Sequence, residues 1–408
     1  MELKKYRLGD IAEIIGGVSY SPKDICTGGI RILRGGNIQN QHIELKTDDV
    51  FLPISYKNNI SQIYVGDTIL VASTGSVDVL GKAATCFQYT EDVQIGAFLR
   101  IIRPKADKYT MLISSALSSD YFKRYIKAQA KGTSINNITL GYLRDFEIYA
   151  PHDFTGLSHL SANIENKICL NRAINDNLEA MAKQLYDYWF VQFDFPNEEG
   201  KPYKSSGGAM VWNEKLKREI PEEWNVANVF DELSVQYGFP FSTELFTEEP
   251  TNIPIVRIRD ILENSVSAYS EEEVDEKYKL QKQDLVIGMD GNFHMNYWND
   301  NVSYLNQRSV RLRAKSKSTV SIMQVKYDIE PYIKAKELRA KGSTVGHLSD
   351  KDLKELFVLV SPNADFRNKF DSILAEIIEN RYEMIALSKQ RDELLPLLMN
   401  GQATVNSD

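Results

Sequence analysis

Four glycine-flanked loops carry side chains that could bind a nucleic acid. Their sequences are ASTGSVDVLGK (72–82), KGTSINNIT (131–139), GMDGNFHMNYWN (288–299) and KGSTVGHLS (341–349). Serine, threonine, asparagine and histidine can hydrogen-bond base edges or phosphates, and glycine lets the backbone come close to a ligand. The same residue types also fill ordinary hydrogen-bonded turns, so both interpretations stay open for any single side chain.

Arginines beside two strand-like stretches could add base recognition. Arg31 and Arg34 lie beside a strand-like stretch that precedes the first pair of loops, and Arg257 and Arg259 lie beside one that precedes the second pair. Arginine is the commonest bidentate reader of guanine, although each of these could equally be a solvated charge. The candidate DNA-binding residues are Arg31, Arg34, Asn37, Ser73, Thr74, Ser76, Lys82, Lys131, Thr133, Ser134, Asn136, Asn137, Arg257, Arg259, Asn292, His294, Asn296, Lys341, Ser343, Thr344 and His347.

Common catalytic motifs are missing from the sequence. It contains no Gly-Lys-Ser/Thr of a phosphate-binding loop, no His-Glu-x-x-His, no Gly-x-Gly-x-x-Gly and no Gly-x-Ser-x-Gly. None of the 13 prolines is adjacent to another, which excludes the Pro-Pro core of an amino-methyltransferase motif. We therefore expect no catalytic residue and no metal site. A stand-alone methyltransferase or nuclease is the alternative.

The size and cysteine content bound the class of protein. A chain of 408 residues is too long for one ordinary core, so two or more domains are expected. No run of about 18 apolar residues occurs, which predicts no membrane span. The N-terminal segment lacks the apolar core of a signal peptide. Three scattered cysteines (Cys26, Cys86 and Cys169) are typical of the cytoplasm, without disulfides.

The net charge of −8 is a weak argument against a nucleic-acid partner. The charge is unevenly distributed, because only the first 150 residues have an excess of basic side chains. The acidic run EEEVDEK (271–277) would repel phosphates, and we expect it to face away from any DNA.

The chain repeats itself. AKGTSINNITLGYLRDFEIYAP (130–151) matches AKGSTVGHLSDKDLKELFVLVSP (340–362) at an offset of 210 residues. Looser matches upstream keep the same order, including IRILRGGNI (30–38) with PIVRIRDI (254–261). A repeat this long is a duplicated domain rather than a solenoid, whose period is about 20–50 residues.

Each copy has the pattern of short strands followed by one long helix. Isoleucine, valine and leucine runs broken by glycine, asparagine and aspartate predict mixed β structure with short helices, for example strands in DTILVAS (67–73) and DLVIGM (284–289). The fold class predicted is α+β, with two pseudo-repeat domains separated by two long helices.

The helices carry a three-four spacing of apolar residues, which predicts an antiparallel coiled coil. Its polar exceptions are Lys167, Asn171, Asn380 and Arg391. The apolar seam residues are Leu157, Leu160, Ile164, Ile174, Leu178, Met181, Leu185 and Tyr188 in the first helix, and Phe370, Ile373, Ile377, Met384, Leu387, Leu394 and Leu398 in the second. Alternatively, each helix packs only on its own domain.

Two similar domains on a rigid spacer have the geometry of a two-part duplex site. Half-sites one turn apart are separated by about 34–36 Å, and a helix of ~30 residues is ~45 Å long. A coiled-coil scaffold without DNA specificity is the other interpretation, and it predicts unrelated loop chemistry in the two copies.

The segment NLEAMAKQLYDYWFVQFDFPNEEGKPYKSSGGAMVWNEKLKREIPEEWNV (177–226) resembles the central region of specificity subunits of type I restriction–modification systems. LRGGNI (33–38) and RDELLPLLMNGQATV (391–405) resemble the same family, so the likeness spans nearly the whole chain. It implies a target-recognition domain at 1–152, a central coiled-coil helix at 153–196, a linker with the second target-recognition domain at 197–362, and a C-terminal coiled-coil helix at 363–408. Each recognition domain would read one half of a bipartite DNA sequence, and the helix pair would set the spacer.

The resemblance also implies the partners. Two modification subunits methylate adenine with S-adenosylmethionine, and two restriction subunits add an endonuclease that needs ATP and Mg. This chain would bind double-stranded DNA in the cytoplasm, would not contact a membrane and would hold no cofactor itself.

The aromatic run YDYWFVQFDFP (186–196) has two interpretations. It could end the helix by capping the second domain, or it could dock a modification subunit, because aromatic residues are favoured as interface anchors. The docking candidates are Tyr186, Tyr188, Trp189, Phe190 and Phe193.

Overall fold

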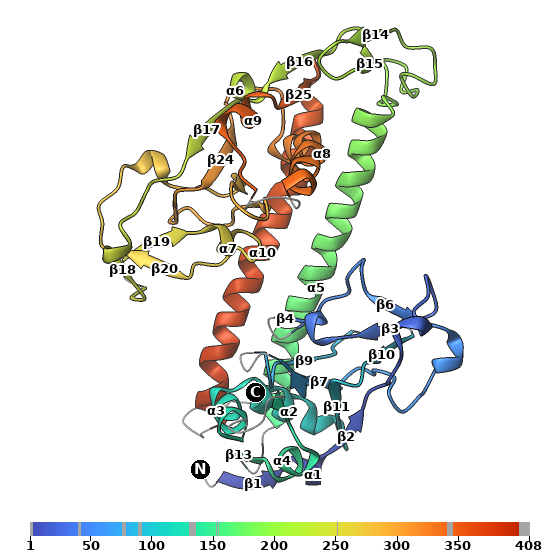
Figure 1. The fold of residues 1–408 in the computed structure, drawn as a ribbon, viewed down its shortest axis with the longest axis vertical. Coiled ribbons are helices and arrows are strands. Elements are labelled where there is room, and N and C mark those ends of the chain that lie inside the picture. Colours follow the sequence, from blue (N-terminus) through green and yellow to red (C-terminus); the bar gives the residue numbers. More distant parts are fainter. Residues whose placement is uncertain are drawn as a thin grey trace. The chain divides into compact units, whose positions relative to one another are not determined.

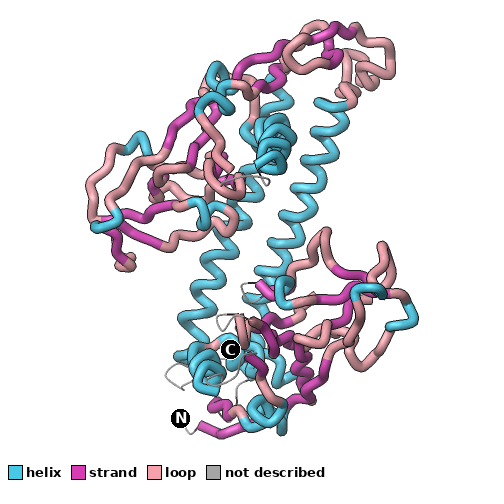
Figure 2. The backbone as a smooth tube through the Cα atoms, viewed as in Figure 1, coloured by secondary structure: helices cyan, strands magenta, loops and turns pink. Residues whose placement is uncertain are grey.

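The computed structural model describes residues 3–39, 42–75, 79–88, 92–129, 136–151, 153, 155–250, 252–340 and 346–399. The chain forms two compact units, Met1–Leu170 with Ala386–Asp408, and Asn171–Ile385. Each unit holds one copy of the repeat and a part of each of two long helices, α5 (Thr155–Tyr186) and α10 (Ala364–Met399) (Figure 1). Strands and helices both contribute to each unit, so the α+β prediction is confirmed (Figure 2).

The first unit is built on a four-stranded antiparallel sheet and a three-stranded mixed sheet. The four-stranded order is β2 (Ala12–Gly16), β11 (Leu99–Pro104), β7 (Thr68–Val71) and β9 (Ala83–Thr85). The three-stranded order is β10 (Val93–Ile95), β3 (Ile30–Leu33) and β6 (Val50–Leu52), with β10 and β3 parallel. Two-stranded ladders join β1 (Leu3–Arg7) to β13 (Glu147–Pro151), β4 (Ile38–Gln39) to β5 (His42–Ile43), and β8 (Ser73–Thr74) to β12 (Asn136–Asn137).

The second unit repeats this topology. Its antiparallel sheet has the order β17 (Leu233–Tyr237), β24 (Ser309–Ala314), β21 (Leu285–Gly288) and β22 (Met295–Tyr297). Its mixed sheet has the order β18 (Phe246–Thr247), β20 (Ala268–Ser270), β19 (Ile253–Val256) and β23 (Tyr304–Leu305), with β19 and β23 parallel. A ladder joins β16 (Asn225–Asn228) to β25 (Phe357–Val360), and a hairpin joins β14 (Met210–Asn213) to β15 (Arg218–Pro221).

Both units also contain further helices. In the first unit they are α1 (Leu8–Ile11), α2 (Thr110–Ser118), α3 (Asp120–Gln129) and α4 (Leu140–Asp145). In the second they are α6 (Val229–Glu232), α7 (Ile258–Ile261), α8 (Ile322–Ala340) and α9 (Asp350–Lys354). The single helix α8 continues through Pro331, whereas α2 and α3 are separated at Ser119.

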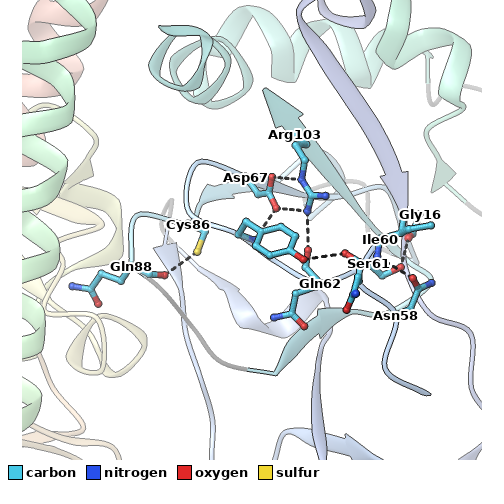
Figure 3. Close-up of polar contacts among 11 residues, drawn as sticks. Gly16, Asn58, Ile60, Ser61, Gln62, Asp67, Cys86, Gln88 and Arg103 are labelled. Atoms are coloured by element: carbon cyan, nitrogen blue, oxygen red, sulfur yellow. Dashed lines mark hydrogen bonds and ion pairs between the residues drawn. The ribbon is translucent and has the colours of Figure 1, made fainter. Parts of the chain in front are cut away.

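An ion pair between a buried aspartate and a half-buried arginine holds the equivalent loop in each copy. In the first unit, Arg103 donates from Nε and Nη2 to the two carboxylate oxygens of Asp67 at 2.9 and 2.8 Å (Figure 3). In the second, Arg313 binds Asp284 in the same way at 2.7 and 2.7 Å. Each arginine also donates to the carbonyl at the start of the loop, Gln62 or Lys279. A bidentate pair fixes the relative orientation of its two side chains as well as their distance, so it holds the strands in the same arrangement in both copies. We call this shared arrangement the frame.

Two lysines and two glycines complete this frame. Lys105 donates to the carbonyls of Gly9 and Asp10, and Lys315 does the same to Phe230 and Asp231. At Gly17 and Gly238 an added Cβ would collide with the carbonyl of Gly96 or Asn306, so only glycine fits at either position. Identical contacts at equivalent positions confirm that the copies share one fold.

In the second unit, α5 and α10 run antiparallel. Asn171 Nδ2 donates to Glu383 Oε2 at 2.6 Å, and Asn380 Nδ2 donates to Asn175 Oδ1 at 3.0 Å. Asn175 also donates to the carbonyl of Ile377 at 3.2 Å. The partner number falls along α10 as the number rises along α5, which defines the antiparallel direction. Buried asparagines that satisfy each other specify register, because a slipped register would leave them unpaired.

The first unit holds the other ends of these helices. Arg391 Nη1 donates to Glu165 Oε1 at 2.6 Å, and each of the two side chains is 10 % exposed. Burial lowers the pKa of Arg391, but hydrogen bonds to Asp392 and Glu165 more than offset it, and the guanidinium stays charged. Leu160 and Leu394 pack against the core of this unit.

The predicted seam is partly wrong. Asn171, Asn380 and Arg391 are buried as expected, whereas Lys167 and Met181 are exposed. The buried stripe of α5 instead contains Ser161, Glu165, Ile168, Asn175 and Ala182. The apolar spacing misled because polar side chains of the two helices pair across the seam and can therefore be buried.

Candidate nucleic-acid interface

Four of the candidate residues surround one open hollow in the second unit. Arg257, Arg259, Asn292 and His294 line it, together with Ile258, Asn306, Gln307 and Arg308. Its volume is about 490 Å³. These residues come from the start of α7, the loop between β21 and β22, and the turn between β23 and β24. The hollow therefore lies where several strands of the two sheets end, and its polar atoms come from loops that the strands hold in place.

The two arginines at α7 differ in how many of their hydrogen-bond donors are already used within the protein. Arg257 donates from Nε to Asp260 at 3.4 Å and from Nη2 to Ser267, and its backbone N–H also donates to Asp260 at 3.0 Å. It is a cap of α7 with a fixed orientation. Arg259 is exposed and makes no hydrogen bond or ion pair with the residues that the structure describes. Its guanidinium has all its donors available for a ligand.

Arg308 is a site residue that the sequence did not suggest. Its side chain is 69 % exposed, and Nη1 donates to Asp290 Oδ2 at 3.0 Å. Asp290 also binds His347 Nδ1 at 2.5 Å through its other oxygen. The backbone of Arg308 has φ of 64°, a region that side-chain-bearing residues rarely adopt. The sequence signal that could have found Arg308 is its position directly before SVRLRA (309–314), where apolar and polar residues alternate as in a strand.

The side-chain amide of Asn296 is used in hydrogen bonds within the protein. Its Nδ2 donates to the carbonyls of Ile261 and Leu262 at 3.2 and 2.8 Å, and its Oδ1 accepts from Arg381 of α10 at 3.1 Å. These bonds use the amide to connect α7 and α10 to β22, and DNA contact by Asn296 stays a prediction.

In the first unit, two of the three candidates around β3 are also structural. Asn37 is 2 % exposed; it donates to Asp49 and to the carbonyl of Glu44, and accepts from the backbone of Arg34. Arg31 lies 3.7 Å from the buried carboxylate of Asp49 and covers the ring of Phe51. Burial and saturated hydrogen bonds correct the DNA-reading prediction for Asn37, and Asp49 holds Arg31 beside the sheet. Arg34 remains exposed, with one 3.4 Å bond to the carbonyl of Asp48.

The remaining candidates of the first unit lie on the ladder between β8 and β12 and on the following turn. Asn137 pairs with Ser73, and Asn136 with Thr74. Lys82 and Asn137 are exposed, and Ser73 and Thr74 are half-buried. The candidates Ser76, Lys131, Thr133, Ser134, Lys341, Ser343 and Thr344 lie outside the described residues, as does the side chain of Asn136.

The aromatic run is a core, which corrects most of the docking prediction. Tyr186, Trp189, Phe190 and Phe193 are between 0 and 7 % exposed. They pack with Trp224, Phe366 and Phe370 of the same unit, with ring centroids of Trp189 and Phe366 4.6 Å apart. The segment Asp187–Val191 is a π-helix, and Trp189 and Phe190 within it are buried. Only Tyr188 among the five is exposed, at 39 %.

Other kinds of site are not found in the described part of the chain. No group of three or more His, Cys, Asp or Glu side chains there is close enough to hold a metal ion. No helix built from those residues has the length and apolar character needed to cross a membrane. The acidic run 271–277 does not line the hollow.

Comparison with known proteins identifies the family. Residues 1–180 and 221–396 both match the model described as "Type I restriction modification DNA specificity domain". The chain belongs to this family. It is a specificity subunit of a type I restriction–modification system, and this membership makes it a non-catalytic subunit.

Individual relatives agree with the family. The MjaIX specificity subunit of Methanocaldococcus jannaschii is 24% identical over 98% of this chain and 93% of its own length. The EcoBI specificity subunit of Escherichia coli is 26% identical over 45% of this chain, which is only 40% of that protein. Among solved structures, the S subunit from M. genitalium covers 99% of this chain and 97% of its own, with 14% identity and a TM-score of 0.50, and so supports the fold.

Proposed function

We propose that each copy reads one half of a bipartite double-stranded DNA target. The observation that carries this proposal is the repeated frame with unlike loops. Asp67–Arg103 and Asp284–Arg313 hold the same strands in the two units, while the loops above them carry different side chains. Two readers with one scaffold and separate surface chemistry suit a target whose two halves differ in sequence.

In the second copy, the reading surface is the hollow around Arg259, Asn292 and His294, with Arg257 as a support. In the first copy it is Arg34, Lys82 and the β8–β12 ladder with Ser73, Thr74 and Asn137. Arginine suits guanine or a phosphate, asparagine suits adenine, and lysine suits a phosphate. The net charge of −8 supports a division in which partner subunits add phosphate contacts.

The helix pair sets the spacer between the half-sites. The paired Asn175 and Asn380 fix one register in the second unit, and the buried Arg391–Glu165 pair does so in the first. Four extra residues between Ile164 and Leu185 add about one turn, or ~6 Å. We expect a longer spacer with both half-sites unchanged, read by sequencing the methylated sites. A changed half-site with the old spacer would contradict the spacer role.

The catalytic steps belong to partners. Two modification subunits bring S-adenosylmethionine and methylate adenine, and two restriction subunits bring the ATP- and Mg-dependent endonuclease. The chain contributes no cofactor, and the complex acts in the cytoplasm. Tyr188, the exposed one of the five docking candidates, contacts a modification subunit.

The decisive experiment is sequencing of adenine methylation in cells with and without this chain, with its modification partner present. We expect a bipartite motif that disappears when the chain is deleted. An unchanged methylation pattern would favour the scaffold interpretation, in which the loops do not read DNA.

A further inference from the structure

Phe98 and Arg308 occupy the same position in the two copies. Each directly precedes the central strand of its sheet, β11 or β24. The carbonyl of Phe98 accepts from Ala72 at 3.0 Å, and that of Arg308 accepts from Met289 at 2.8 Å. The neighbouring contacts match as well, because Gly96 donates to Leu33 at 2.9 Å and Asn306 donates to Val256 at 3.1 Å.

The side chains of Phe98 and Arg308 both extend into solvent. Phe98 is 67 % exposed and the side chain of Arg308 is 69 % exposed. A phenylalanine and an arginine have opposite hydration, so the same site offers an apolar face in one copy and a cation in the other. In the second unit Arg308 lines the hollow that holds the candidate DNA-binding residues.

The residues next to Phe98 also differ in charge from the residues next to Arg308. Asn137 pairs with Ser73 in the first unit, and His347 forms the equivalent bridge with Asp290 in the second. Asp290 binds Arg308 and His347 through separate oxygens and so orients the guanidinium. Ser73 and Asn137 are neutral, as suits an apolar neighbour. One guanidinium nitrogen of Arg308 is held by Asp290, and the other two have no partner among the described residues, which leaves a two-donor edge.

We propose that this position determines specificity in both half-sites. Arg308 binds N7 and O6 of a guanine, Asp290 is its positioning residue, and Phe98 contacts the methyl group of a thymine. This inference rests on the proposed function and deepens it. It predicts one guanine in the half-site of the second copy and one thymine in the half-site of the first.

The test uses the complex with its modification partner and synthetic duplexes that contain the methylated motif. Replacing the guanine with 7-deazaguanine removes N7, and replacing the thymine with deoxyuridine removes the methyl group. We expect methylation by the wild-type complex to fall on the order of 10-fold at the 7-deazaguanine, or about 1.4 kcal/mol, because the guanidinium loses one of its two base acceptors. Arg308→Ala should methylate slowly but show no further loss, and Phe98→Ala should become indifferent to deoxyuridine.

Matched variants separate base reading from charge and from folding. Arg308→Lys keeps the charge and a donor for N7 but loses the planar fork, so it should show a 7-deazaguanine effect smaller than that of the wild type and larger than that of Arg308→Ala. Asp290→Ser should weaken that effect while leaving the deoxyuridine effect intact. Ile54→Ala, which truncates another exposed apolar side chain of the first unit, should keep both effects.

The outcomes also separate this inference from the proposed function. A bipartite motif with full sensitivity to both analogues in the Arg308→Ala and Phe98→Ala complexes would overturn the inference alone. The absence of any bipartite motif in the wild type would overturn the proposed function. Loss of only one analogue effect would restrict the inference to that copy and refute it for the other.

Discussion

The two copies keep the residues that build the frame and differ in those on its loops. Asp67 and Arg103 recur as Asp284 and Arg313, and Lys105 recurs as Lys315. At the turn before the central strand, Phe98 is replaced by Arg308. The difference separates fold from specificity: one set of buried contacts supports two unlike surfaces.

The copies also differ in their cores. The second unit contains a cluster of aromatic rings around Phe190 and, at Asp328, a half-buried aspartate whose carboxyl group accepts three hydrogen bonds. All four tryptophans (Trp189, Trp212, Trp224 and Trp298) lie within Asn171–Ile385. Tryptophan fluorescence therefore reports on the second unit alone, so unfolding of that unit can be followed separately.

The largest expected effect is an exchange of the second reader. Replacing residues 211–362 with the matching segment of another specificity subunit should change one half of the methylated sequence and leave the other half and the spacer unchanged. Sequencing of adenine methylation measures this. A change in both halves, or in neither, would show that the copies do not read independently.

Truncation of the aromatic core should destabilise the second unit. Phe190 is fully buried between Trp224 and Phe366, so Phe190→Ala should lower the free energy of unfolding by about 3–5 kcal/mol. Urea unfolding followed by tryptophan fluorescence measures it. Tyr188→Ala, on the exposed side of the same turn, is the control and should cost less than about 1 kcal/mol. Similar losses for both would contradict the core assignment of Phe190.

The second unit should lose stability as the pH rises, because of Asp328. Burial raises the pKa of its carboxyl group to about 6, although Tyr186, Gln324 and the N–H of Leu359 donate to it and favour its charged form. A raised pKa means that the folded state holds the proton more tightly than the unfolded state. The contribution is therefore complete below about pH 4 and is lost as the pH rises through about 6.

The variant Asp328→Asn isolates this term. The difference in unfolding free energy between the wild type and Asp328→Asn should change by roughly 3 kcal/mol between pH 4 and 7, in the direction that favours the wild type at low pH. Tryptophan-detected urea unfolding at several pH values gives this difference. A difference that does not vary with pH would mean that the carboxyl group titrates normally.

The smallest expected effect compares two helix caps. Ser349 accepts from the N–H of Asp352 at 3.3 Å, and Asp352 accepts in return from the N–H of Ser349, whereas Thr139 makes only the bond from Tyr142 at 3.4 Å. Ser349→Ala should cost about 1 kcal/mol, and Thr139→Ala should cost less. Amide hydrogen exchange in α9 and α4 would measure the two losses of stability. Equal losses for Ser349→Ala and Thr139→Ala would show that the reciprocal bond does not stabilise α9.

Much of the fold could be predicted from residue pattern. Ile, Val and Leu runs before glycine turns gave β7 and β21, and the change to a helical period gave α5 and α10. These patterns are local, because a strand or helix must turn its apolar side chains to one face whatever it packs against. The duplication also predicts that the second copy has the same topology as the first.

The candidate site was less predictable. Arg34 aligns with Arg257, since both cap the turn after their strand, whereas Arg259 aligns with Gly36 and has no arginine counterpart. Asn37 and Asn296 looked like free amides in the sequence, but distant partners such as Asp49 and Arg381 use their hydrogen bonds. A polar side chain looks the same in a sequence whether or not another segment satisfies it.

The sequence by itself determined the two copies, the two long helices and the family, because repeats, periodicity and motifs are properties of the chain order. Only the tertiary structure decided which side chains are available to DNA. Asp290 meets Arg308 and His347 because strands and bridges bring together residues far apart in the chain. It also decided that the helix seam is polar, since Asn175 is stable in the interior only where Asn380 faces it.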